Sequence, residues 1–511
     1  MAARRSALSA LASAAVLAAP LALAGCTAGS TAIVAGGPST LAVGFTAEPQ
    51  NFDFTTTDGA AIPQALLYNV YETLVKIDSD GEITGGLAES WDVSDDRTVY
   101  DFHLRDDATF SNGEPFTASD VEFSVERVKQ DWTISLQSGM DVVDRVEVVG
   151  EYHARVVLSR PSNSWLRAMT TRIGAMFDPS GVADLANDPV GTGPYDVESR
   201  RRGDAVVLTR NPEYSRPGSP RPEPDYRTVV LKYYADATAL NNALLSGGID
   251  VISGVTAPDS VPQFEADNRF RVLQGTTNGE VVLAYNNRRA PLDDVRVRKA
   301  LTYAVDRKAL LEAAWGGRGE LIGSMVPPTD PWFEDLSGEY PYDPDRARRL
   351  LREAGHESLR LNLRIANLPY AVSSAQVVAA HLKKVGVTVD IEPLDFPAVW
   401  LQQVFTDGDY DMSIVQHVEP QDITTFGDPE FYWGYDSERV QRLLTEADTA
   451  PPREYIADMR RVARTLSDDA AANWLFLFPN IVVAKNEVRG LQANQVSESF
   501  DLTGLRRQEP S

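Results

Sequence analysis

The stretch from Gln416 to Asp422 combines the side chains with the clearest chemical potential, because an imidazole, His417, lies close to two carboxylates, Glu419 and Asp422. Imidazole and carboxylate groups suit transition metals. The chain has five histidines with no cluster among them, so we expect His417 to be a hydrogen-bonded loop histidine and predict no metal site. A carboxylate enclosed away from water needs a cation beside it. Glu419 therefore either holds a positively charged group or caps its own loop, and the sequence leaves both open.

Aromatic side chains follow in the run from Phe431 to Tyr435. Such rings stack on sugars, on peptide side chains and on cationic amines. For Phe431 the alternative is a hydrophobic plug beneath a long loop. Trp433 and Tyr435 also carry a polar group, so we predict that these two contact a ligand.

Cys26 is the only cysteine, and it follows a segment with the layout of a secretory signal. Arg4 and Arg5 provide positive charge, an apolar alanine-rich run follows, and small residues precede Cys26; this order is typical of exported proteins. The alternative is a hydrophobic N-terminal helix that happens to contain a cysteine, but the run is too short and too rich in alanine for a good membrane span.

The segment Leu23-Ala-Gly-Cys26 resembles a bacterial lipobox. The resemblance implies that residues 1–25 are a lipoprotein signal peptide and that Cys26 becomes the lipidated first residue. Residues 26–40 are small and almost uncharged, so we expect a flexible tether there. No cysteine remains to form a disulfide, and the fold must depend on burial.

The composition indicates a large soluble protein exposed to solvent. The chain has 511 residues, of which 43% are hydrophobic and 24% charged, as is ordinary for globular proteins of more than one domain. A formal net charge of −25 argues against nucleic acid as a partner and against a polybasic membrane surface. Beyond the N-terminal segment, no stretch is apolar and long enough to cross a bilayer.

The chain lacks the common catalytic motifs. It has no Gly-x-Ser-x-Gly elbow, no His-Glu-x-x-His helix and no P-loop, and its one cysteine belongs to the predicted lipobox. Gly191-Thr-Gly193 begins like a dinucleotide fingerprint but lacks the third glycine. We therefore predict no catalytic residue and no cofactor, and a protein that binds rather than an enzyme.

Strands and helices alternate along the chain. Residues 99–104 have a mixed strand pattern, and Thr117 to Asp120 resembles a capping box before a helix; Val121, Val125 and Val128 would share its buried face.

Further along, Asp294 caps a predicted helix whose buried face holds Val297, Leu301, Ala304 and Val305. Other expected elements are helices from Asp343-Pro344 to Gly355 and over 375–384, and strands over 387–391 and 411–415. The alternation predicts an α/β fold with mixed sheets.

A series of sequence blocks then identifies a family. In order and spacing they resemble family 5 extracytoplasmic solute-binding proteins, the peptide- and nickel-type receptors of ABC importers, from about Leu41 to the C-terminal end. The blocks are Leu87–Trp91, Tyr100–Arg105, Phe110–Gly113, Pro115–Val121, Pro189–Tyr195, Asn211–Tyr214, Ser246–Asp250, Pro291–Leu301, Tyr342–Pro344, Leu350–Gly355 and Val385–Val389.

The resemblance implies a two-lobed periplasmic-binding-protein-like fold of the class II type, with an extra subdomain and a ligand cleft between the lobes. We expect lobe I to comprise residues 41–75, 188–282 and 480–511, with the extra subdomain at 76–187 and lobe II at 283–479. Trp91 and Phe110, in the matching blocks, are expected in the core.

By the same resemblance, the cleft is lined by residues 56–61, 171–177, 276–278 and 367–370 and by the loop after Val415. Peptide receptors of this family carry in that loop a Gly-Trp followed by an acid that pairs with the peptide's α-ammonium group. Here His417 stands at the tryptophan position, and the acid is Glu419 or Asp422. The expected ligand-binding residues are Thr276, Thr277, Asn278, Asn367, Tyr370, His417, Glu419, Asp422, Trp433 and Tyr435.

Dipeptide receptors of the family also clamp the ligand carboxylate with an arginine near 367–370, but this chain has no basic residue between Arg364 and His381. Longer peptides or non-peptide solutes are therefore favoured over dipeptides.

We expect a monomeric receptor, lipid-anchored on the extracytoplasmic face of the membrane, that passes a peptide or peptide-like amine to an ABC permease. The alternatives are a receptor for an opine, an oligosaccharide, nickel or a metallophore, or a transport-inactive relative that regulates or scaffolds an envelope protein.

Overall fold

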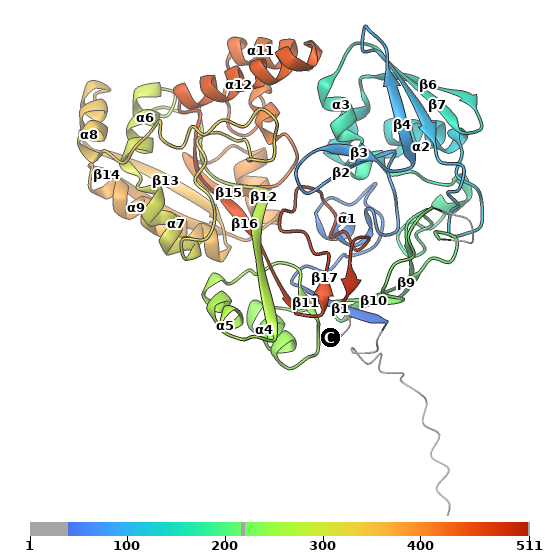
Figure 1. Cartoon of the computed structure of the whole chain (residues 1–511). Helices are drawn as coiled ribbons and strands as arrows, with labels where there is room; N and C mark the ends of the chain where they lie inside the picture. Colours follow the sequence, from blue (N-terminus) through green and yellow to red (C-terminus); the bar gives the residue numbers. More distant parts are fainter. Residues whose placement is uncertain (1–38, 216–219, 509–511) are drawn as a thin grey trace, which may run out of the picture. The chain divides into compact units, whose positions relative to one another are not determined.

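The computed structural model describes residues 39–215 and 220–508 (Figure 1). Cys26, the signal peptide at 1–25 and almost all of the tether at 26–40 lie outside the described residues, so these expectations stay predictions. The first strand begins at Thr40, next to the predicted start of the folded body at Leu41.

In the described part of the chain, a ten-stranded mixed sheet has the order β14-β13-β15-β12-β16-β11-β1-β10-β9-β8. Parallel pairs (β1 with β10 and β11, β13 with β14 and β15) stand beside antiparallel ones. The strands are β1 (Thr40–Phe45), β8 (Tyr195–Arg201), β9 (Ala205–Arg210), β10 (Thr228–Tyr233), β11 (Val251–Ile252), β12 (Phe270–Tyr285), β13 (Leu359–Ala366), β14 (Val387–Leu394), β15 (Met412–His417) and β16 (Ala472–Lys485). The mixed α/β architecture is the one expected.

Two long strands join the halves of this sheet. β12 and β16 pair antiparallel from Phe270 opposite Lys485 to Ala284 opposite Ala472, with an irregularity between Thr276 and Glu280, and Figure 1 shows them running together between the two sets of strands. Pro479 lies opposite Thr276 and has no N–H to donate, which is why proline in a sheet is confined to edges and irregular positions. The ladder is therefore interrupted where the chain passes from one half to the other.

A second sheet with the order β4-β5-β7-β6 packs against helix α2 (Ala118–Asp131). The capping box is confirmed: the Thr117 amide donates to Asp120 at 2.8 Å. The predicted strand at 99–104 is confirmed as β5, and Val121, Val125 and Val128 are buried as expected. The strands of this second sheet are β4 (Ala88–Val93), β5 (Val99–Leu104), β6 (Val143–Gly150) and β7 (His153–Leu158).

The helices beside β13–β15 follow their capping signals. Asp294 accepts from the Arg296 amide at 2.8 Å at the start of α6 (Val295–Ala304). Asp343 does the same for Arg346 in α8 (Pro344–Glu353), after which Gly355 has φ +85°. The helix predicted over 375–384 instead spans Pro369–Lys383 as α9, because Pro369 at its first turn suits a helix start.

The remaining elements are short strands and helices. They are α1 (Ala61–Leu66), β2 (Val75–Ile77), β3 (Ile83–Gly85), η1 (Ser135–Met140), α3 (Asn163–Ala168), η2 (Arg172–Gly174), η3 (Pro179–Val182), α4 (Ala237–Leu245), η4 (Pro258–Ser260), α5 (Val261–Glu265), α7 (Arg307–Trp315), α10 (Ala398–Trp400), η5 (Leu401–Thr406), η6 (Asp422–Gly427), α11 (Glu438–Thr449), α12 (Pro452–Asp468), β17 (Val488–Arg489) and β18 (Arg506–Arg507). Among the described residues, none of these helices has both the length and the apolar character of a membrane span.

The two halves of the ten-stranded sheet contribute to separate hydrophobic clusters. One combines residues 41–231 with the last strands and the C-terminal segment, and others lie within 281–477. Phe110 is fully buried in the first cluster, which confirms that it belongs to the core, whereas Trp91 is partly buried and packs against this cluster. The predicted lobe boundaries at 282/283 and 479/480 stay predictions; the strand irregularity lies beside them.

A polar contact joins the start of α3 to the end of α11. The Asp448 carboxylate accepts from Arg160 Nη1 at 2.6 Å, from Ser162 Oγ at 2.9 Å and from the Ser164 amide and hydroxyl at 3.0 and 2.7 Å. Asn163 donates to the Ala447 carbonyl at 2.8 Å. Several donors around one partly buried carboxylate give a directional bond between segments far apart in sequence.

We expect Asp448→Ala to lower the free energy of unfolding by about 2–3 kcal/mol, because the donors of Ser162 and Ser164 lose a charged acceptor. Chemical denaturation measures the change. Glu446→Ala, which removes an exposed carboxylate from the same helix, is the matched control and should change the value by less than about 0.5 kcal/mol. Equal effects from both variants would contradict the role given to Asp448.

Candidate functional site

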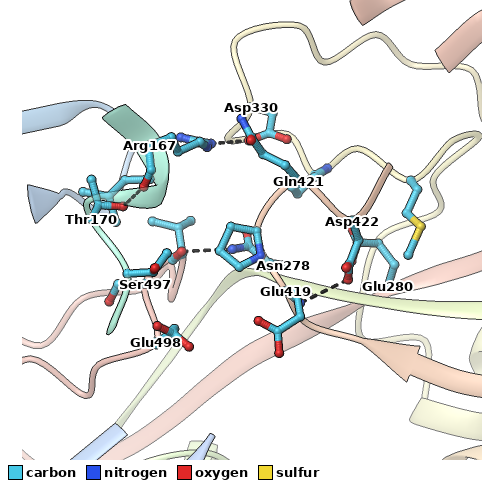
Figure 2. Close-up of a pocket in the computed structure, with 16 residues that line it drawn as sticks. Arg167, Thr170, Asn278, Glu280, Asp330, Glu419, Gln421, Asp422, Ser497 and Glu498 are labelled. Atoms are coloured by element: carbon cyan, nitrogen blue, oxygen red, sulfur yellow. Dashed lines mark hydrogen bonds and ion pairs between the residues drawn. The ribbon is translucent and has the colours of Figure 1, made fainter. Parts of the chain in front are cut away.

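A polar pocket lies where the loop after β15 meets α3 and the C-terminal segment (Figure 2). Its cavity volume is about 10 Å³, so the pocket is nearly closed in this structure. The lining residues are Ile77, Arg167, Thr170, Thr171, Asn278, Glu280, Met325, Pro327, Asp330, Glu419, Pro420, Gln421, Asp422, Val496, Ser497 and Glu498.

Strand pairing brings the acidic residues of this pocket together. Glu280 on β12 lies opposite His417, the last residue of β15, so the loop that leaves β15 starts beside Glu280 and carries Glu419 and Asp422 into the same space. Asn278, in the interrupted part of β12, donates to the Val496 carbonyl at 2.9 Å. The irregularity in β12 therefore faces both the acidic loop and the C-terminal segment.

Glu280 is the most enclosed acid of the pocket. Glu280 is 2% exposed, and its carboxyl oxygen Oε2 has no hydrogen-bond partner among the described residues. Burial, together with the nearby charge of Asp422, raises the pKa of Glu280 well above its usual range. Our prediction from the sequence missed this residue; an acid at the head of the apolar run Val281–Tyr285 is the signal that could have found it.

Asp422 lies beside Glu280 (Figure 2) and accepts from the Glu419 amide at 3.1 Å. Burial and the charge of Glu419 raise the pKa of Asp422 well above its usual range. Burial first, and then the charge of Glu498, also raises the pKa of Glu419. In the described residues, none of Glu280, Glu419 and Asp422 forms an ion pair with an arginine or a lysine.

The other two pocket acids are neutralised. Asp330 forms a buried ion pair with Arg167, and Glu498 accepts from Arg172 Nε at 2.6 Å and from its amide at 2.8 Å. Arg172 also donates to the Gly59 carbonyl at 3.2 Å. These pairs leave Glu280, Glu419 and Asp422 without an arginine or lysine ion pair in the described part of the chain. Nδ1 of the neutral His417 lies 3.8 Å from the Asp422 carboxylate, and the charge of Arg172 acts on Glu419. Arg167, Asp330 and Glu498 were not predicted, because no sequence pattern links such distant segments.

His417 does not line this pocket, and its predicted contact with a ligand stays a prediction. Its Nε2 is 2.8 Å from the Tyr432 hydroxyl and its ring stacks on Tyr432, as expected for a hydrogen-bonded loop histidine. Burial lowers the pKa of His417 to about 3, so the imidazole is neutral. Across the described residues, no three histidine, cysteine, aspartate or glutamate side chains are placed to hold a metal ion.

Trp433 and Tyr435 also differ from expectation. Trp433 is 0% exposed, stacks on Phe426 with ring centroids 4.8 Å apart, and donates from Nε1 to Thr425 Oγ1 at 3.2 Å. Tyr435 donates to Asp469 at 2.6 Å from within the same core cluster. Their polar groups are satisfied inside the core, so these rings support the loop rather than line the pocket.

The other expected residues divide into three groups. Asn278 lines the pocket, whereas Thr276 lines a neighbouring cavity beside Pro479. Thr277 donates to the Phe478 carbonyl at 2.9 Å, and the Tyr370 hydroxyl accepts from the Gln416 amide at 2.9 Å. Both therefore position backbone around the pocket without lining it.

Asn367 is exposed just before α9 and lies outside the lining set, contrary to expectation. Arg364, the nearest arginine, is held by Glu392 at 3.0 Å and by Asp409 at 2.7 Å. No carboxylate clamp forms there in the described structure, in keeping with the gap in basic residues.

Comparison with known proteins shows the family of the chain. Residues 82–441 match the family described as bacterial extracellular solute-binding proteins, family 5 Middle. A di/tripeptide-binding protein of Pseudomonas aeruginosa is 30% identical over 95% of this chain and 98% of its own. A probable D,D-dipeptide-binding periplasmic protein of Escherichia coli is 24% identical over 90% and 92%.

Solved structures share the fold. The substrate-binding protein CtaP of Listeria monocytogenes superposes with a TM-score of 0.81 at 23% identity, covering 93% of this chain and all of that one. A periplasmic binding protein of Helicobacter pylori in complex with the peptide STSA gives 0.79 at 22% identity, over 92% and 98%. The chain therefore belongs to the family 5 extracellular solute-binding proteins and has their two-lobed α/β fold.

The raised pKa of Glu280 has a consequence for stability. Because the folded state holds a proton that the unfolded state releases, the associated stabilisation is complete below the unfolded pKa of about 4.3 and is lost as pH rises through the folded pKa. We expect Glu280→Gln, which is neutral throughout, to increase the free energy of unfolding of the ligand-free protein at neutral pH.

Denaturation curves from about pH 4 to about pH 8 check this expectation. The difference between Glu280→Gln and the unmodified protein should grow with pH, whereas Glu446→Gln at an exposed site should show no such trend. A difference that stays constant over this range would mean that Glu280 ionises as freely in the folded state as in the unfolded one.

Proposed function

We propose that this protein is an extracytoplasmic receptor for a solute with a positively charged amine, in the simplest case a peptide with a free amino terminus, and that it delivers this solute to an ABC importer. The observation that supports this most directly is the set of three pocket carboxyl groups, Glu280, Glu419 and Asp422, none of which forms an ion pair with an arginine or a lysine among the described residues. Binding without covalent change is proposed as its whole activity.

The electrostatics of the pocket favour such a solute. A charge removed from water needs a partner of opposite sign nearby, and their attraction strengthens as water is excluded. An entering ammonium group would supply the partner that Glu419 and Asp422 lack. A ligand with only anionic or neutral groups would leave these acids enclosed and unpaired.

The names of relatives support peptides as the first ligands to test. The Pseudomonas relative is named for di- and tripeptides and the Escherichia coli relative for D,D-dipeptides. Others are named for haem or solved with agropinic acid or a nickel complex, so the family accommodates different solutes. The pocket acids of this chain favour an amine, and the absence of an arginine clamp near Asn367 favours a ligand longer than a dipeptide.

Blocking the ligand's amine tests this proposal. We expect the tripeptide Ala-Ala-Ala to bind at least about 30-fold more tightly than its N-acetylated form, because an enclosed charge pair that loses one partner costs about 2–5 kcal/mol. Isothermal titration calorimetry measures the dissociation constants of both forms of the tripeptide. Glu419→Gln should weaken the binding of the free tripeptide, and the control Glu446→Gln should leave its affinity unchanged. Equal affinity for both forms of the tripeptide would reject an amine site, and product formation would reject a pure receptor.

We also propose that the receptor acts as a monomer tethered to the outer face of the cell membrane through lipid on Cys26. The lipobox-like segment before Cys26 and the small residues after it support this proposal. A tether would raise the effective concentration of the loaded receptor at its permease without any new contact between them.

Substitution of the lipidated position tests the anchor. In a bacterial host, we expect the unmodified protein to sediment with membranes and Cys26→Ser to be found in the soluble extracytoplasmic fraction. Intact mass spectrometry should show lipid on the first and none on the second. A protein of unmodified mass that sediments with membranes in both forms would exclude lipid on Cys26 as the anchor.

A further inference from the structure

We propose that the preferred solute carries two positive charges close together, one held by Glu419 and the other by Glu280 with Asp422. This inference rests on the amine receptor proposed above and narrows its ligand to an amino-terminal lysine or ornithine residue with a free amino group, or a diamine of similar reach.

The unpartnered oxygen of Glu280 is the first reason. Glu280 is 2% exposed and lines the pocket, yet Oε2 has no hydrogen-bond partner in the described residues. A buried polar atom without a partner costs stability, and most such atoms in folded proteins have one. Glu280 is where β12 resumes its pairing after the interruption, opposite Leu477 and His417, and none of the described side chains around it satisfies Oε2. In the proposed complex, a group of the ligand is the partner of this oxygen.

The charges facing the pocket are the second reason. Glu280 belongs to β12. Glu419 and Asp422 belong to the loop after β15, and the neutral His417 lies behind them. From other elements come the paired groups Asp330 with Arg167 and Glu498 with Arg172, and the charges of Arg172 and Asp58 also act on Glu419. One ammonium group beside Glu419 leaves the adjacent pair Glu280 and Asp422 without a positive partner, so burial continues to disfavour ionisation of this pair.

The positions of these acids favour two charges on one residue of the ligand. The Glu419 amide donates to Asp422, so both acids belong to one tight loop, and Figure 2 shows Glu280 beside Asp422 while Glu419 stands nearer Glu498. The two acidic positions are therefore neighbours across one small pocket. An α-ammonium group and a side-chain ammonium group of the same residue could reach one position each.

Proton release is the signature that separates this arrangement from its main alternative. Burial disfavours the ionised form of Glu280 and Asp422 and raises the pKa of both. A second ammonium group would displace a proton from this pair, and affinity would rise with pH. If the protonated pair instead donated a hydrogen bond to a ligand carbonyl, binding would release no proton and would weaken as pH rises.

The experiment compares Lys-Ala-Ala with norleucine-Ala-Ala, which has a side chain of similar length and no charge. We expect the lysine peptide to bind at least about tenfold more tightly near neutral pH, and the ratio of the two constants to grow with pH. Calorimetry in two buffers of different ionisation enthalpy should detect protons released by the lysine peptide and fewer by the norleucine peptide.

Variants then assign the second charge to its carboxyl groups. Glu280→Gln should reduce the ratio of the two constants to about one, and Asp422→Asn should reduce it as well, whereas Glu446→Gln should keep the ratio of the unmodified protein. The proton measurement uses the unmodified protein and decides the question even if a variant fails to fold.

The outcomes separate this inference from the proposed function. Two results would refute a second positive charge on the ligand: equal affinity for norleucine-Ala-Ala and Lys-Ala-Ala, or proton uptake when the lysine peptide binds. Either result would leave the proposed amine receptor intact. A failure of both peptides and of the diamine cadaverine to bind overturns the amine receptor as well.

Discussion

The antiparallel pairing of β12 with β16, and its interruption beside Pro479, is the constraint on which the rest of the structure depends. The two strands carry the sheet from one hydrophobic cluster to the others. Because the ladder breaks between Thr276 and Glu280, Asn278 lies outside the regular pairing, and Glu280 resumes it opposite His417, at the point where the acidic loop leaves β15. The passage of the chain from one half of the sheet to the other and the pocket therefore depend on the same irregularity of the backbone.

The pocket places carboxyl groups where burial disfavours their charge, a cost that the surrounding structure must offset. Two of its acids are matched by Arg167 and Arg172, and the neutral His417 and the core rings beneath it hold the loop without adding charge. Away from the pocket, the bonds around Asp448 join α3 to α11. Stability is supplied outside the site, and three carboxyl groups remain available to a ligand.

Much of the fold could be predicted from local patterns. The capping signals at Thr117, Asp294 and Asp343 and the strand at 99–104 are confirmed, because hydrogen bonds and turn geometry within a few residues decide them. The start of α9 was placed too late, since polar and small residues after Pro369 weaken the helical pattern. The acidic loop at 416–422 was located by resemblance, and two of its residues, Glu419 and Asp422, line the pocket.

The sequence alone determined the solute-binding class, the alternation of helices and strands, and the acidic character of the loop, because these depend on residue types at short spacing. Only the tertiary structure decided which acids share a space. Glu280 reaches Asp422 through the pairing of β12 with β15, and Arg172 reaches Glu498 from far along the chain. It also decided that Trp433 and Tyr435 are core, because burial depends on packing between segments that no local pattern records.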